Sequence, residues 1–94
     1  GERVANQLLS PNMLNYIELS KEYNIEEIVI PSKMAEKSLR ELDIRAKYNV
    51  SVIAIVSGTE IIISPSPDQI IHNGDLLVMI GHREDLSKFS MLGD

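Results

Sequence analysis

The residues best suited to bind a ligand lie in one short segment that begins at Ile44 and ends at Val50. The guanidinium of Arg45 is a planar fork that suits a phosphate, and Lys47 adds a point charge. The Asn49 amide could read a base edge or a ribose, while the two terminal apolar residues offer walls for a nucleobase. These side-chain types together have the chemistry of a small anion site.

Cations are concentrated around this segment although the chain as a whole is acidic. The formal net charge is −5, but residues 33–47 hold five cations and three acids, so this stretch carries +2 and the remainder −7. An acidic chain disfavours nucleic acid polymers as partners, because phosphate backbones require a basic face. The plainer interpretation is a solvated surface in which Arg45 and Lys47 pair with Asp43 and Glu41, and spacing alone favours it. If the segment lies on a two-fold axis, each cation is present twice, and the matching ligand is two-fold symmetric and doubly anionic.

Catalytic and metal-binding patterns are missing from the sequence. The chain has no Cys, which excludes disulfides, thiolate metal sites and Cys nucleophiles and fits a reducing compartment. His72 and His82 fall in separate turns, and neither is accompanied by a Cys or an acidic pair at ligand spacing, so we predict no metal site. No nucleotide-loop, zinc-protease or nucleophile-elbow motif occurs, and no Ser has a His nearby. We therefore predict no catalytic residues and a chain that is not an enzyme.

The elements that must position the segment follow from apolar periodicity. The 94 residues suffice for one small domain, whose apolar content is mostly Ile, Leu and Val in runs typical of buried strands. Ser38 and Glu41 have the spacing of a capping box, so the regular part of the central helix could begin only at Ser38. We predict the stretch from Asp43 to Asn49 to be a helix exit, with Asn49 left-handed. Strands are predicted over residues 13–19, 25–30, 50–56, 60–64 and 76–80, and helices over 3–9, 35–42 and the residues after His82.

This order predicts an α+β fold: a small, mainly antiparallel sheet with flanking helices. The strand at residues 50–56 is apolar on both faces, so we expect both faces to be covered. One central helix cannot cover so much surface, and the natural cover is a second copy, so we predict a homodimer. No apolar run approaches the roughly 20 residues needed to span a bilayer, so direct membrane insertion is not expected. The start at Gly1, followed at once by a helical pattern, suggests a piece of a longer chain.

Several runs resemble the C-terminal domain of RCK proteins, also called TrkA-C. More narrowly, they are similar to the KtrA and KtrC gating subunits of Ktr potassium transporters in Gram-positive bacteria. The runs that carry the resemblance cover nearly the whole chain: Tyr16-Ile17-Glu18-Leu19-Ser20; Leu39-x-x-Leu42-Asp43-Ile44-Arg45-Ala46-Lys47-Tyr48; Val50-x-Val52-Ile53-Ala54-Ile55; and Ile63-x-Pro65-x-Pro67-x-x-Ile70-Ile71-x-x-Gly74-Asp75-x-Leu77-x-x-x-Gly81.

The resemblance implies a regulatory role for this domain, in a cytosolic ring that gates a membrane potassium-translocating subunit. It implies that a homodimer binds cyclic di-AMP at its interface, and we expect this binding to inhibit potassium uptake. It divides the chain into residues 1–24, an N-terminal helix and lead-in strand, and residues 25–94, the ligand-binding domain. The nucleotide-binding domain that precedes this one in the family, and through which the ring assembles, is not in the sequence. The protein would be cytoplasmic, at the inner face of the membrane through its transporter partner.

The site residues implied by the resemblance largely coincide with the segment chosen from chemistry. Arg45 would bind a phosphate, Asn49 would contact an adenine or ribose edge, and the remaining residues would form walls or flanking contacts. Two alternatives remain open: a purely structural dimerisation domain, and a divalent-cation sensor that uses carboxylates and His82. The predicted contacts for cyclic di-AMP are Ile44, Arg45, Ala46, Lys47, Asn49, Val50 and Pro65.

Overall fold

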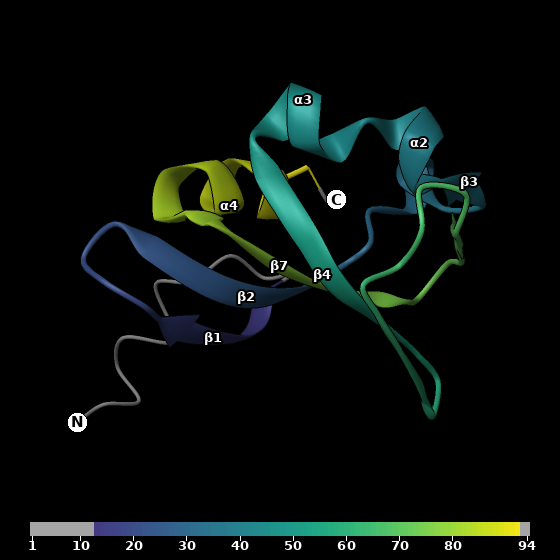
Figure 1. The fold of residues 1–94 in the computed structure, drawn as a ribbon, viewed down its shortest axis with the longest axis horizontal. Helices are drawn as coiled ribbons and strands as arrows, with labels where there is room; N and C mark the ends of the chain where they lie inside the picture. Colours follow the sequence, from purple (N-terminus) through teal and green to yellow (C-terminus); the bar gives the residue numbers. More distant parts are fainter. Residues whose placement is uncertain (1–12, 93–94) are drawn as a thin grey trace.

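A computed structural model describes residues 13–92, which form one five-stranded sheet with helices packed on it (Figure 1). All of its strand pairs are antiparallel, which confirms the predicted α+β class. Each predicted strand is present, with its ends moved by a few residues. In spatial order the strands are β1 (Met13–Glu18), β2 (Tyr23–Val29), β7 (Leu76–His82), β4 (Val50–Ser57) and β5 (Glu60–Ile63).

A second sheet of two very short strands supports the region before the central helix. Strand β3 (Lys37–Ser38) pairs with β6 (Ile70–Ile71), and a 3-10 turn, η1 (Ser32–Met34), precedes them. The predicted helix at residues 35–42 is therefore wrong in its first half. Strands of two residues show no periodicity, and their pairing joins segments about 30 residues apart in sequence, so neither strand was predicted.

The central helix is in fact two short helices with a sharp turn between them. Helix α2 (Leu39–Leu42) begins after Ser38, and both hydrogen bonds of the predicted capping box are present. Asp43 then adopts a left-handed conformation, with φ 49° and ψ 45°, and helix α3 (Ile44–Tyr48) follows. The stretch from Asp43 to Asn49, predicted to be the exit of the central helix, thus contains a second short helix. Asn49 ends it with φ 61°, as predicted for a residue that tolerates the left-handed region.

The closing helix, α4 (Arg83–Ser90), lies against β2 and β7. Its Leu86 and Phe89 are fully buried, but Met91, expected among its apolar positions, lies just past the helix and is 71% exposed. Tyr48 of α3 meets the Phe89 ring edge-on, with centroids 5.2 Å apart, which joins the two helices. The core consists of Ile28, Ile30, Met34, Leu42, Ile44, Val50, Ile55, Ile71, Leu77, Met79, Leu86 and Phe89.

The labelled α-helices of the described residues all lie on one side of the sheet (Figure 1). On the edge strand β5, Ile61 and Ile63 are 62% and 70% exposed. The prediction that both faces of β4 are covered holds for the consecutive residues Ala54 and Ile55, which are buried on opposite faces. It is wrong at Ile53, which is 37% exposed where the pairing of β4 with β7 shifts register.

Two further sequence predictions concern an N-terminal helix and membrane-spanning segments. The helix at residues 3–9 lies outside the described residues. Within residues 13–92, no helix is both long and apolar enough to cross a membrane.

Candidate functional site

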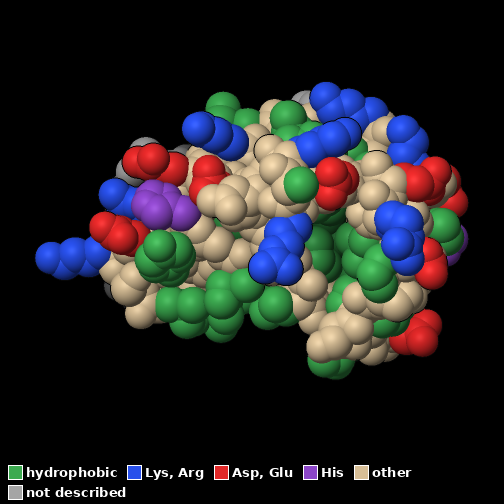
Figure 2. All heavy atoms as spheres, turned by 45° about the horizontal axis from the view of Figure 1, so that its top comes forward, with side chains coloured by type: hydrophobic (Ala, Val, Ile, Leu, Met, Phe, Trp, Pro, Cys, Tyr) green, Lys and Arg blue, Asp and Glu red, His purple; other side chains and the backbone are tan. Residues whose placement is uncertain are grey.

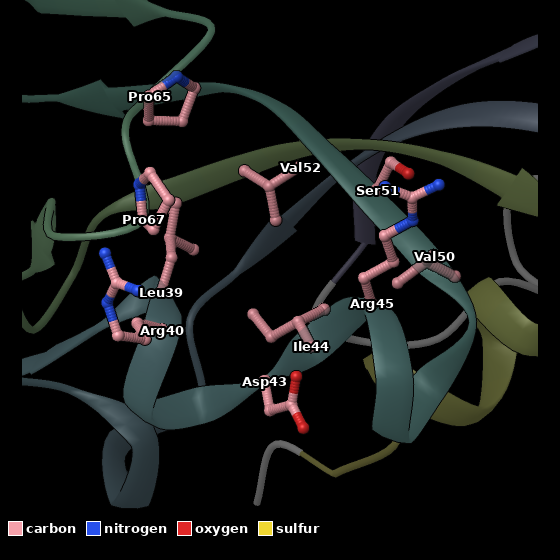
Figure 3. Close-up of a pocket in the computed structure, with 10 residues that line it drawn as sticks. All are labelled: Leu39, Arg40, Asp43, Ile44, Arg45, Val50, Ser51, Val52, Pro65 and Pro67. Atoms are coloured by element: carbon pink, nitrogen blue, oxygen red, sulfur yellow. The ribbon is translucent and has the colours of Figure 1, made fainter.

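A pocket of about 320 Å³ opens beside α2 and α3 (Figure 3). Its walls come from three parts of the chain: the two short helices, the start of β4, and the proline-rich loop after β5. Figure 2 shows a hollow lined by hydrophobic side chains on this face of the molecule, with basic side chains on either side. The lining residues are Leu39, Arg40, Asp43, Ile44, Arg45, Val50, Ser51, Val52, Pro65 and Pro67.

The left-handed turn at Asp43 orients the helical wall. Because the chain changes direction there, Ile44 points into the core and is 3% exposed, while Arg45 stays on the rim. Val50, 2% exposed, continues the wall at the start of β4. A Cβ added to Gly81 of β7 would lie 2.9 Å from Cγ1 of Val50, so the close approach of these two strands requires glycine at position 81.

The proline wall is held by backbone hydrogen bonds to α2. The amide of Leu39 donates to the carbonyl of Gln69 at 3.1 Å, and the amide of Arg40 donates to the carbonyl of Pro67 at 2.7 Å. At the other end of the loop, the Ser64 amide donates to Ile53 at 2.9 Å while Ser64 itself is left-handed, with φ 49°. The two contacts of α2 join segments about 30 residues apart, and together with the bond of Ser64 they hold the proline loop at both of its ends.

The electrostatics of the pocket differ from the plainer interpretation of the sequence. Neither Arg45 nor Lys47 forms an ion pair with any residue in the range 13–92, so the expected pairs with Asp43 and Glu41 are wrong. The Glu41 carboxylate instead accepts from the Ser38 amide at 2.9 Å. This hydrogen bond, together with the one that the Ser38 side chain makes, lowers the pKa of Glu41. Arg45 therefore presents its charge at the rim of a largely apolar pocket.

Four of the seven predicted contacts line the pocket: Ile44, Arg45, Val50 and Pro65. Ala46 and Lys47 are exposed outside it. Asn49 does not line the pocket, and its side-chain amide donates to Oδ2 of Asp85 on α4 at 3.2 Å.

Six lining residues were not among the predicted contacts. Arg40 and Asp43 belong to the charged stretch, and Pro67 belongs to the Pro-x-Pro motif, so a signal existed for these three. Nothing in a single sequence distinguishes the other three from ordinary strand and helix residues: Leu39, Ser51 and Val52.

The two histidines have structural partners outside the pocket. His72 Nδ1 lies 3.0 Å from Oε1 of Glu36, and the Asn73 amide donates to Oε2 of the same carboxylate at 3.2 Å. The hydrogen bond with His72, followed by that with Asn73, lowers the pKa of Glu36. His82 Nδ1 accepts from the Glu84 amide at 3.1 Å and caps α4. Among the described residues, no three His, Asp or Glu side chains gather as a metal site would require.

This fold and pocket define a small α+β domain with a cationic, partly apolar surface site. A family model of the TrkA-C domain matches residues 25–92, and the chain belongs to this family. The Ktr system potassium uptake protein C of Bacillus subtilis is 44% identical over 89 residues, which cover 95% of this chain and 40% of that protein. Protein A of the same system and organism is 41% identical over 93 residues, with 99% and 42% covered. The chain thus spans about two fifths of the length of these two relatives.

Solved structures agree with this assignment. A potassium transport protein KtrA RCK C domain in complex with cyclic diadenosine monophosphate is 41% identical, with a TM-score of 0.71 over 96% of this chain and 95% of that one. The GsuK channel bound to NAD is 29% identical, with a TM-score of 0.68 over 74% of this chain and 13% of that one. An RCK_C domain dimer of S. agalactiae BusR, also in complex with cyclic di-AMP, is 24% identical with a TM-score of 0.67 over 72% of this chain and 86% of that one, which shows a shared fold alone.

Proposed function

We propose that this chain is the cytosolic regulatory domain of a potassium-transport gating subunit, and that two copies bind one cyclic di-AMP between them. The observation that carries the proposal is the guanidinium of Arg45, without an ion pair among the described residues, at the rim of a largely apolar pocket. The complex of a KtrA RCK C domain with cyclic di-AMP, 41% identical to this chain, supports the same ligand.

The size of the pocket favours a ligand shared by two copies. Ligand pockets in proteins measure about 300–1,000 Å³, and 320 Å³ lies near the lower end of that range. One such pocket has room for about one nucleotide unit, whereas cyclic di-AMP has two identical units related by a two-fold axis. Two pockets facing each other across a homodimer axis would enclose the whole ligand.

The seven predicted contacts have different tasks in this proposal. Arg45 forms charge-assisted hydrogen bonds with a phosphate. Ile44, Val50 and Pro65 contact the adenine through their apolar surfaces. Ala46 and Lys47, which are exposed beside the pocket, flank the ligand. Asn49 would have to leave Asp85 to reach an adenine or ribose edge, so its contact stays a prediction.

At the level of the cell, we propose that ligand binding inhibits potassium uptake. The relatives from Bacillus subtilis are potassium uptake proteins more than twice as long as this chain, which supports a gating ring built through a further domain and a separate membrane subunit. In this arrangement the domain is not an enzyme, and it acts in the cytoplasm at the inner face of the membrane.

Calorimetry with three ligands tests the binding proposal. We expect cyclic di-AMP to bind at one ligand per two chains, and cyclic di-GMP and linear pApA to bind much more weakly. Arg45→Ala should weaken cyclic di-AMP binding by about 1.5–3 kcal/mol, the range for charged hydrogen bonds. Arg83→Ala, which removes an exposed cation from α4 instead, should leave the affinity unchanged and serves as the matched control.

Three results would contradict the proposal. Absence of heat with cyclic di-AMP would exclude this ligand, and equal heat with all three compounds would exclude specific recognition. An unchanged affinity in Arg45→Ala would remove Arg45 from the site.

A further inference from the structure

A second guanidinium, that of Arg40, belongs to the same pocket. Arg40 lies on α2 beside Pro67, on the side of the pocket opposite Arg45, with Leu39, Ile44 and Val52 between them (Figure 3). The apolar floor is therefore bordered by a cation at each end. Arg40 is not among the ligand contacts that the resemblance implies.

The surroundings of Arg40 keep part of its guanidinium available. Its Nε donates to Oδ1 of Asp68 at 3.1 Å, and its backbone amide donates to the carbonyl of Pro67. The two terminal nitrogens of the guanidinium make no hydrogen bond with any described residue. The side chains of Arg40 and Asp68 are 66% and 79% exposed, and an exposed ion pair of this kind is weak enough for an anionic ligand to compete with it.

We propose that Arg40 is a second phosphate-binding side chain of the site and that Asp68 sets the affinity by competing with the ligand for Arg40. The proposal rests on the proposed function, since it concerns the same pocket and the same dianionic ligand. In a homodimer each chain would then offer two guanidiniums to the two phosphates of the ligand, and the Asp68 carboxylate of each chain would compete with the ligand for one of them. Asp68 thus limits how tightly the ligand binds.

A double-mutant cycle measures this competition. Arg40→Gln keeps most of the aliphatic stem and the backbone bond to Pro67 but removes the charge. It should weaken cyclic di-AMP binding about 3- to 10-fold, less than Arg45→Ala, because Arg40 is already partly engaged. Asp68→Asn keeps an oxygen acceptor for Nε but removes the negative charge, and should tighten binding about 2- to 5-fold.

The two substitutions should not be additive. In the Arg40→Gln background, Asp68→Asn should leave the affinity almost unchanged, because the cation for which Asp68 competes is gone. Arg40→Gln should also reduce the dependence of log affinity on log salt concentration, since one fewer cation neutralises the ligand. Glu60→Gln on β5, which removes an exposed carboxylate by the same substitution chemistry, should change neither quantity.

The outcomes separate this proposal from the proposed function. If Arg45→Ala weakens binding as expected while Arg40→Gln binds like the unmodified chain, the function stands and the role of Arg40 is excluded. If Asp68→Asn tightens binding equally with and without Arg40, Asp68 repels the ligand directly and the competition is excluded. If the unmodified chain does not bind cyclic di-AMP at all, both proposals are wrong.

Discussion

Glu26 is a buried carboxylic acid on the core-facing side of β2. It is only 4% exposed and lies on the same face as Ile28. Asn24 donates its side-chain amide to Oε2 of Glu26 at 3.0 Å, whereas Oε1 is buried and has no hydrogen-bond partner among residues 13–92. Burial raises the pKa of Glu26, and the hydrogen bond from Asn24 offsets part of this effect. The native state therefore binds a proton at Glu26 more tightly than the unfolded chain does.

The raised pKa of Glu26 predicts a pH dependence of stability. As the pH rises from the ordinary carboxyl range through the raised pKa, the free energy of unfolding should fall, because the native state must bury a charge. Glu26→Gln cannot ionise, so its stability relative to the unmodified chain should increase over this window. Urea unfolding from about pH 4 to pH 8 measures the difference, at about 1.4 kcal/mol for each unit of pKa shift.

Two carboxylates with a lowered pKa do not affect the difference in unfolding free energy between Glu26→Gln and the unmodified chain. Glu36 and Glu41 contribute stability that is lost as the pH falls, which is the opposite direction, but they titrate in both proteins and cancel in the difference. Glu60→Gln, at an exposed position, should follow the unmodified chain. A constant difference between Glu26→Gln and the unmodified chain at every pH would contradict the raised pKa.

At the scale of elements, helix α2 positions much of the pocket. Helix α2 has four residues, so hydrogen bonds at its start are a large share of what holds it in place. The Ser38 hydroxyl accepts from the Glu41 amide at 3.1 Å, and the Glu41 carboxylate returns a bond to the Ser38 amide. The amides of Leu39 and Arg40 then hold the proline loop. The capping box and the ligand pocket are therefore parts of one local structure.

Removing the capping hydroxyl should affect both stability and binding. Ser38→Ala should lower the free energy of unfolding by about 0.5–2 kcal/mol, the usual cost of a lost helix cap. It should also weaken ligand binding, because α2 would no longer hold Leu39 and Arg40 firmly. Chemical unfolding and calorimetry on the same preparations measure both effects.

Ser32→Ala is the matched control for this loss, since the Ser32 hydroxyl makes no hydrogen bond with a described residue. It should leave stability and affinity within experimental error. An equal loss of stability in the two variants would exclude a specific role for the cap.

At the scale of the whole molecule, two surfaces favour a second copy. In the proposed function each pocket would take about half of a two-fold symmetric ligand, and β5 exposes Ile61 and Ile63 at an edge of the sheet. A ligand that contacts both copies at once must stabilise the dimer by the same free energy by which dimer formation strengthens ligand binding. Association and binding are therefore coupled if the proposed function is correct.

This coupling can be measured by sedimentation. We expect the chain to form a dimer. The dissociation constant of the dimer should fall when cyclic di-AMP is added at a concentration above the dissociation constant of the ligand. Arg45→Ala should dimerise normally without ligand and lose the ligand effect, because its substitution affects the phosphate contact alone. A monomer at all concentrations, with and without ligand, would contradict both the shared site and a structural role in dimerisation.

Much of this protein was predictable from the sequence because the signals are local. Strand positions follow from runs of Ile, Leu and Val, the start of α2 follows from the spacing of Ser38 and Glu41, and the left-handed Asn49 follows from its residue type. Chemistry and resemblance also selected Arg45, which the structure places at the rim of a pocket. The division at residue 25 and the ligand contacts of all seven predicted site residues stay predictions.

The tertiary structure alone decided which residues meet at the pocket. Arg40 reaches the site because the amides of α2 bind carbonyls in the loop that carries Pro67 and Asp68. Where the first half of the central helix was predicted, the structure has the short strand β3, which pairs with β6 about 30 residues away in the sequence. Periodicity and capping describe neighbours in the chain, whereas a pocket wall made of segments about 30 residues apart depends on packing and hydrogen bonds that form only when the whole domain folds.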